Sequence, residues 1–185
     1  MTRLRPILVL GAALLPACAE RTPDAVPADT APPTSAPAPD ADMTVTSSGV
    51  GPVRIGMTLA EVHTALVAPL TQPVEMQQEC DYANFPAAGG SVFLMVHRDT
   101  VVRVDIAPAG LRTDGGVGVG SSAAEVETAH GTLERQPHKY VTGEYLVTAP
   151  DQAGNRLVFE TDSAGTVTAY RAGREPYVRW VEGCS

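Results

Sequence analysis

The sequence lacks the residue patterns that most often support catalysis. Its three cysteines include no Cys-x-x-Cys pair, its four histidines form no His-Glu-x-x-His motif, and it has no Gly-x-Ser-x-Gly motif. The glycine-rich stretch 115–122 lacks the lysine that a phosphate-binding loop requires. The sequence leaves open whether carboxylates such as Glu61 and Glu125 converge in the folded chain. We predict a protein that is not an enzyme and has neither a cofactor nor a metal site.

Positive charge and long apolar segments are also scarce. The chain has 13 Lys and Arg against 21 Asp and Glu, a formal net charge of −8. So acidic a chain does not neutralise phosphates, which argues against a nucleic-acid partner. The longest apolar run, residues 7–15, is too short to cross a bilayer and follows Arg3 and Arg5. This pattern is typical of a secretory signal peptide, which we place at residues 1–17.

The end of that segment resembles the lipobox of bacterial lipoproteins. Leu15, Ala17 and Cys18 stand at positions −3, −1 and +1 of the expected cleavage site. The resemblance implies that Cys18 becomes a lipidated N-terminus carrying acyl chains such as palmitate, which would anchor the chain to a membrane. Ala19, rather than Asp, follows Cys18, which favours the outer membrane, facing the periplasm. The alternative is an ordinary signal peptide with Cys18 at the cleavage site by chance.

The remaining two cysteines are Cys80 and Cys184. An even pair in an exported, oxidising compartment predicts a structural disulfide. A metal pair or a redox couple is the alternative, but the cysteines do not have Cys-x-x-Cys spacing and no histidine cluster accompanies them.

The segment after Cys18 contains little that could form a core. Residues 18–42 are mainly Pro, Ala, Asp and Thr. Such a composition cannot bury enough apolar surface to offset the entropy of ordering, so we predict a disordered linker between the lipid and the folded body.

The folded body contains an internal sequence repeat. Residues 51–66 and 115–130 are identical at eight of sixteen positions without a gap. A repeat of this kind predicts two similar structural units, which we place at residues 43–110 and 111–185.

Each copy of the repeat carries the same helix-start signal. Thr58 precedes Glu61 by three residues, and Ser122 precedes Glu125 by three residues. This is the pattern of a capping box, so we predict a helix after Thr58 and another after Ser122.

Runs rich in β-branched and aromatic residues follow each predicted helix, and they predict antiparallel strands. The expected strands are 80–86, 91–96, 101–106, 140–148, 157–161, 166–170 and 177–181. The predicted fold class is therefore α+β, with two tandem helix-plus-antiparallel-sheet repeats of about three strands each, packed as one body.

The helix openers carry a family resemblance. Residues 55–58, Ile-Gly-Met-Thr, with Glu61 and Val62, and more loosely residues 119–122 with Glu125 and Val126, resemble two related groups. One is the β-lactamase-inhibitor-protein-like fold, in which tandem repeats form a concave sheet surface. The other is the SmpA/OmlA-type lipoprotein family, an accessory of outer-membrane β-barrel assembly. The resemblance implies a binding protein.

Aromatic residues make up only 5% of the chain, yet most of them lie in its second half together with arginines. Tyr, Trp and Arg most often anchor protein interfaces, so these residues are candidates for partner binding. The alternative is that several of them pack the second sheet. The candidates are Tyr145, Tyr170, Arg171, Arg174, Tyr177, Arg179 and Trp180. We predict a protein-binding module facing the periplasm; an inhibitor of an exported enzyme or an assembly accessory are the alternatives.

Overall fold

The structure is a computed structural model that describes residues 43–72 and 79–184. These residues all fall within one structural unit, 36–185. The predicted signal peptide, the lipidation site Cys18 and the linker 18–42 lie outside the described residues.

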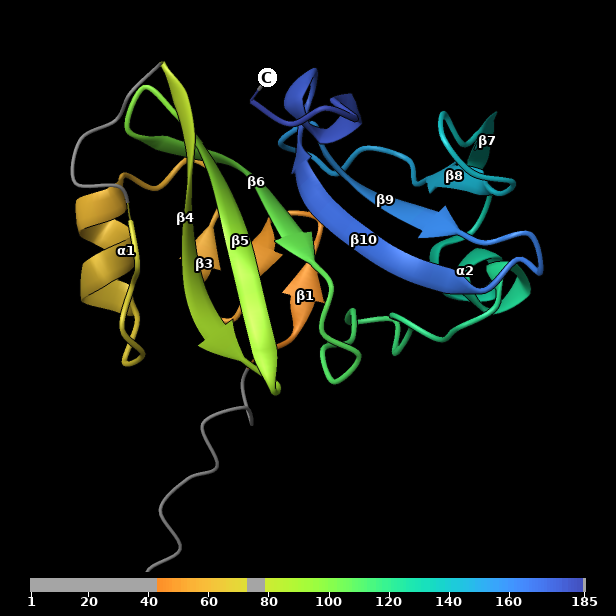
Figure 1. Cartoon of the computed structure of the whole chain (residues 1–185), viewed down its shortest axis with the longest axis horizontal. Coiled ribbons are helices and arrows are strands. Elements are labelled where there is room, and N and C mark those ends of the chain that lie inside the picture. The colour runs from red at the N-terminus through yellow and green to blue at the C-terminus, as the bar shows by residue number, and fades with distance from the viewer. Residues whose placement is uncertain (1–42, 73–78, 185) are drawn as a thin grey trace, which may run out of the picture. The chain divides into compact units, whose positions relative to one another are not determined.

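A seven-stranded antiparallel sheet forms the body of the protein (Figure 1). The strand order is β4-β5-β6-β10-β9-β8-β7, so two meanders meet where β6 pairs with β10. The strands are β4 (Cys80–Ala87), β5 (Gly90–His97), β6 (Thr100–Ile106), β7 (Glu134–Pro137), β8 (Glu144–Val147), β9 (Asn155–Thr161) and β10 (Val167–Arg174).

Smaller elements cover one face of this sheet. A three-stranded sheet lies behind β4–β6 in Figure 1, while α2 lies behind β9 and β10. These elements are β1 (Val45–Thr46), β2 (Gly49–Val50), β3 (Val53–Arg54), α1 (Leu59–Ala65) and α2 (Ala123–His130). The 3₁₀ helix η1 (Tyr177–Arg179) lies on the opposite face, where buried arginines bind its backbone carbonyls. Among the described residues, no helix combines the length and apolar composition needed to cross a bilayer.

The predicted fold class is wrong. The protein is mostly β, with one continuous seven-stranded sheet, a separate three-stranded sheet and helices of only seven and eight residues. It is not a pair of helix-plus-three-strand repeats. The strands β1, β2 and β3 span two residues each, which is too short for an alternating pattern to appear in the sequence.

The two predicted helix starts are confirmed. Thr58 accepts a hydrogen bond from the backbone N–H of Glu61 at 3.3 Å, and the Glu61 carboxylate accepts one from the N–H of Thr58 at 2.8 Å. Ser122 and Glu125 make the same reciprocal pair at 3.3 and 2.7 Å. The capping boxes correctly predict where the helices begin, but they contain no information about helix length.

Most of the predicted strands are present, and the β5–β6 hairpin is an example in which the turn residues favour strand pairing. The β5–β6 hairpin closes with His97 opposite Thr100, and the two residues between them, Arg98 and Asp99, have φ of 49° and 60°. Two positive φ values are typical of the type I′ turn, whose twist matches that of paired strands.

Two of the predicted strands are wrong in extent or in kind. The run 140–148 is a strand only at Glu144–Val147, where it pairs with the unpredicted β7 on one side and with β9 on the other. The run 177–181 contains the 3₁₀ helix η1 instead of a strand. Its backbone carbonyls are bound by arginine side chains rather than by a neighbouring strand.

The main core lies between the sheet and the elements behind it. Residues of the central strands face this core in alternation, interrupted by register shifts in the β5–β6 and β9–β10 pairs, and include Leu94, Ile106 and Phe159. The helices contribute one fully buried side chain each, Val62 and Val126. The opposite face, which we call the outer face, carries the intervening residues.

The chain ends in a segment that crosses the outer face, residues 176–184, which we call the C-terminal strap. It contains η1 and ends at Cys184, whose disulfide to Cys80 at the start of β4 confirms the predicted pairing. The two Cα atoms are 5.4 Å apart, and the bond joins positions separated by 104 residues.

Candidate functional site

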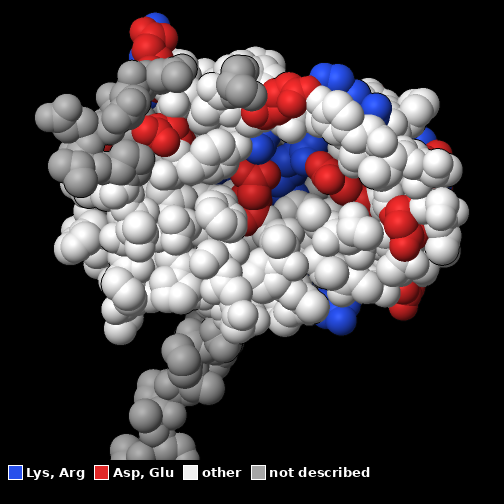
Figure 2. Space-filling view, viewed as in Figure 1, with Lys and Arg blue, Asp and Glu red and all other residues white. Residues whose placement is uncertain are grey.

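The outer face holds a pocket of about 230 Å³ beside the C-terminal strap. Figure 2 shows it as a hollow in the middle of this face, with basic groups at its floor and acidic groups on either side. Its lining residues come from β5, β6, β9, β10 and the strap. They are Phe93, Arg103, Asp105, Ile106, Ala107, Glu160, Ala169, Tyr170, Arg171 and Val181.

Strand register brings the charged residues of the pocket together. Asp105 on β6 lies directly opposite Arg171 on β10. Glu160 on β9 lies opposite Ala169, two positions along β10 from Arg171. Arg103 precedes Asp105 by two residues, so the two share one face of β6. The pocket thus depends on the pairing of β6 with β10, which joins the two meanders.

Two buried arginines hold the C-terminal strap in place. Arg103 is 5% exposed and donates through Nη1 to the carbonyl oxygens of Tyr177 at 3.0 Å and Trp180 at 2.6 Å. Arg171 is 6% exposed and donates through Nε to the carbonyl oxygen of Val178 at 2.6 Å. A guanidinium buried this far needs such partners. The arginines and the disulfide together fix the strap against the sheet.

Arg103 also organises one side of the pocket. Its Nε donates to Asp105 Oδ2 at 2.9 Å, and its Nη2 donates to the Tyr82 hydroxyl at 2.7 Å. Burial raises the pKa of Asp105, with a further contribution from Glu160, and the arginines only partly offset this. Burial likewise raises the pKa of Tyr82, with Asp105 adding to the effect.

Glu160 organises the other side. One of its oxygens accepts a hydrogen bond from Arg171 Nη1, and the other lies 3.4 Å from Nε2 of His138. His138 Nδ1 accepts hydrogen bonds from the backbone N–H groups of Tyr140 at 3.2 Å and Val141 at 3.3 Å. Because Nδ1 acts as an acceptor, the ring hydrogen of neutral His138 belongs on Nε2, where it points to Glu160.

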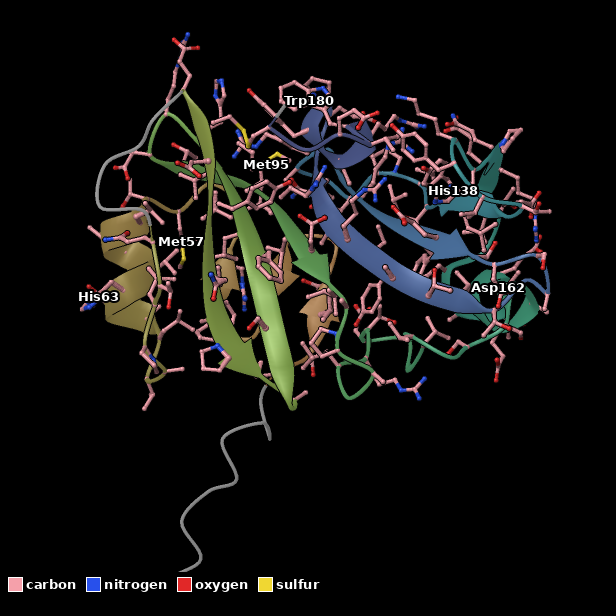
Figure 3. The ribbon with its side chains drawn as sticks, viewed as in Figure 1. Met57, His63, Met95, His138, Asp162 and Trp180 are labelled. Atoms are coloured by element: carbon pink, nitrogen blue, oxygen red, sulfur yellow. A yellow bond between two sulfur atoms is a disulfide. The ribbon has the colours of Figure 1, made fainter. Side chains whose placement is uncertain are left out.

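Tyr145 lies beside this group on the outer face. Its ring stacks on His138 with centroids 4.4 Å apart, and the guanidinium carbon of Arg171 lies 5.6 Å from the ring centroid. His138 lies just after β7 and is labelled in Figure 3, as is Trp180 on the strap. In the part of the chain that the structure describes, the Tyr145 hydroxyl is buried without a hydrogen-bond partner.

The pocket therefore presents acid–base groups but no good nucleophile. Its lining includes two carboxylates, Asp105 and Glu160, and no serine, cysteine, lysine or histidine. The hydroxyl of Tyr170 donates to the carbonyl oxygen of Leu111 at 3.0 Å, so it is used within the core. Within residues 43–72 and 79–184, no three histidine, cysteine or acidic side chains come together as metal ligands. The arrangement is suited to binding a charged group.

The structure brings only some of the sequence-predicted site residues together. Arg171 lines the pocket, and Tyr145 packs beside it. Tyr170 is 1% exposed and lies on the core side, where it stacks on Phe159 with centroids 5.3 Å apart. Arg174 ends β10 and is half-buried, outside the pocket lining.

The other three predicted residues belong to the C-terminal strap. Tyr177 and Trp180 make an edge-on ring contact, with centroids 4.7 Å apart, and Trp180 is 37% exposed. Arg179 forms ion pairs with Glu134 at 2.7 Å and Glu175 at 2.8 Å. Arg171 and Arg179 therefore belong to separate ion pairs.

Four important residues of the pocket were missed as site residues: Phe93, Arg103, Asp105 and Glu160. The sequence does contain a signal for two of them, because Arg103 and Asp105 alternate with apolar residues along β6. That alternation predicts a solvated face, yet Arg103 is buried under the strap. An arginine inside an apolar strand is the signal that could have been used.

The sequence matches no protein-family model, and no curated protein is significantly similar to it. Among solved structures, it is similar to a DUF4309 family protein (YjgB) of Bacillus subtilis, with 15% identity, coverage of 72% of this chain and 88% of the other, and a TM-score of 0.47. The uncharacterised protein yfeY of Escherichia coli gives 16% identity, coverage of 71% and 99%, and a TM-score of 0.48.

An extracellular protein of Bacillus anthracis that contains an SCP domain is similar at 11% identity with a TM-score of 0.47. The likeness covers 74% of this chain but only 47% of that protein.

Proposed function

We propose that this chain is an exported lipoprotein that acts by binding a protein partner on its outer face, without catalysis and without a cofactor. In this proposal Cys18 carries the lipid, the outer membrane holds the anchor, and the binding face is turned to the periplasm. The Cys80–Cys184 disulfide is in keeping with an oxidising compartment. Nucleic acid is not a partner in this proposal, because the chain is acidic.

The observation that carries the proposal is the combination of a charged pocket with exposed apolar side chains at its walls. Phe93 is 42% exposed and Val181 is 36% exposed, although both line the pocket. An exposed aromatic side chain beside a hollow is a common anchor of protein interfaces. The fixed position of the C-terminal strap also favours binding, because a preorganised surface loses little conformational entropy when a partner binds.

A photo-crosslinking amino acid at position 93, in native envelopes, would test the proposal. We expect one dominant adduct at position 93 and none at the fully exposed control position 67. The adduct should disappear when a second, unlabelled copy of the chain is supplied in excess, and it should persist when that copy carries Phe93→Arg. A Cys18→Ser chain tests whether the anchor is needed. Absence of a position-specific adduct would contradict the proposal.

The identity of the partner would separate the narrower functions. A soluble exported enzyme whose activity falls on binding would mean that the protein is an inhibitor. A membrane β-barrel or a component of its assembly machinery would mean that the protein is an assembly accessory.

A further inference from the structure

We propose that the pocket receives a cationic side chain, arginine or lysine, from the bound partner. This inference rests on the proposed function and names the chemistry that the pocket recognises.

The carboxylates, not the guanidinium groups, are the accessible charges of the pocket. The side chains of Asp105 and Glu160 are 27% and 23% exposed, whereas those of Arg103 and Arg171 are 6% and 7% exposed. Figure 2 agrees, since acidic groups flank the hollow and basic groups lie at its floor. A ligand that enters the pocket meets carboxylate oxygens first.

The arginines are mainly engaged in holding the protein together. Arg103 donates to Asp105, to Tyr82 and to two carbonyl oxygens of the strap. Arg171 donates to Glu160 and to another strap carbonyl. An anionic ligand would have to compete with these bonds or rely on the remaining N–H donors, which belong mostly to Arg171.

Asp105 has capacity for another donor. Among the described residues, its hydrogen bonds from side chains come from Arg103 alone and reach Oδ2, which leaves Oδ1 for a ligand. The raised pKa of this carboxyl indicates that its negative charge is only partly compensated within the protein. A cation placed between Asp105 and Glu160 would supply the missing compensation, and pairing of this kind is strongest where water is excluded.

The walls and size of the pocket fit one long side chain. Phe93, Ala107, Ala169 and Val181 supply apolar surface for the methylene groups of lysine or arginine. The exposed ring of Phe93 can also stack on a guanidinium. A volume of about 230 Å³ is below the roughly 300–1,000 Å³ of pockets for drug-sized ligands, which suits a single side chain. The net charge of −8 would favour the approach of a basic partner.

The test uses N-acetyl-arginine amide as a probe, titrated into the exported chain carrying Cys18→Ser and followed by amide NMR shifts. N-acetyl-citrulline amide has nearly the same shape without the charge, and N-acetyl-glutamate amide has the opposite charge. We expect saturable shifts at Phe93, Asp105 and Glu160 with the arginine probe, and binding weaker by about tenfold or more with the citrulline probe.

Charge-removing variants locate the binding group. Asp105→Asn should weaken binding of the arginine probe by about tenfold or more, whereas Asp99→Asn, in the exposed β5–β6 turn, removes the same charge and should leave binding unchanged. Should Asp105→Asn disturb folding, the comparison of arginine and citrulline probes on the unaltered chain still decides the matter. Equal binding of those two probes, or preference for the glutamate probe, would overturn the proposal.

The outcomes also separate this inference from the function on which it rests. A position-specific adduct at residue 93 without binding of the arginine probe would leave the protein-binding function standing and overturn the cation pocket. Saturable binding of the arginine probe without any adduct would support the cation pocket and overturn the protein-binding function.

Discussion

Arg103 and Arg171 each make two kinds of contact, an ion pair and hydrogen bonds to the backbone. Each is an ion-pair partner of a pocket carboxylate, and each donates to the backbone of the C-terminal strap, Arg103 to two carbonyl oxygens and Arg171 to one. A lysine could not replace either one, because its single ammonium lacks the planar set of donors that reaches several acceptors at once. The pocket charges and the position of the strap therefore depend on the same two residues.

His130, at the end of α2, is a half-buried titratable residue. Its Nε2 lies 3.2 Å from the Thr113 hydroxyl, and its ring packs on Phe159 with centroids 5.6 Å apart. Burial lowers the pKa of His130 below its ordinary value of 6.5, and nearby Asp114 opposes this only partly. The folded protein thus disfavours the protonated ring.

We expect the free energy of unfolding to decrease as the pH falls from 6.5 toward the lowered pKa of His130. In that window the unfolded chain binds a proton that the folded chain does not. His130→Gln should remove this part of the pH dependence, while His63→Gln, on the exposed side of α1, should keep it. Urea unfolding at pH 7.5 and at pH 5.5 gives the change in the free energy of unfolding between the two pH values. If this change were the same in His130→Gln as in the unaltered protein, the prediction would be contradicted.

At the scale of elements, the helices depend heavily on their caps. α1 and α2 span seven and eight residues and fully bury one side chain each, and isolated helices of this length are unstable. The reciprocal bonds between Thr58 and Glu61 satisfy backbone N–H groups that the first turn leaves free.

Thr58→Ala should therefore lower the free energy of unfolding by about 0.5–2 kcal/mol, because the orphan N–H of Glu61 loses its acceptor. Thr58→Ser keeps the hydroxyl and should remain close to the unaltered protein. Chemical denaturation measures both variants. A loss in Thr58→Ser equal to that in Thr58→Ala would mean that the methyl group, not the cap, supplies the stability.

At the scale of the whole molecule, the Cys80–Cys184 disulfide ties the end of the chain to the first strand of the large sheet. It closes a loop of about one hundred residues, which strongly restricts the unfolded chain. It also holds the C-terminal strap, which supplies Val181 to the pocket.

Replacing both cysteines, Cys80→Ser with Cys184→Ser, should lower the free energy of unfolding by about 2–5 kcal/mol. Reductant should produce the same loss in the unaltered chain and no further loss in the double variant, a comparison that thermal melts provide directly. If reductant did not change the melting temperature of the unaltered chain, a stabilising role for the bond would be contradicted.

Several features could be predicted from the sequence because they depend on neighbouring residues. The helix starts follow from side chains that bond backbone groups three residues away. The β5–β6 hairpin follows from two alternating runs separated by a two-residue turn. The disulfide follows from the number of cysteines once one is assigned to the lipid.

The tertiary structure alone decided the strand order, the burial of Tyr170 and the pocket. The pairing of Asp105 with Arg171 joins residues 66 positions apart, and the strap reaches Arg103 from more than 70 positions away. No local pattern encodes such contacts, because many registers of similar apolar strands satisfy the same alternation. The fold class was mispredicted for this reason: the sequence determined where most strands form, and long-range packing decided that they form one sheet with a charged hollow at its centre.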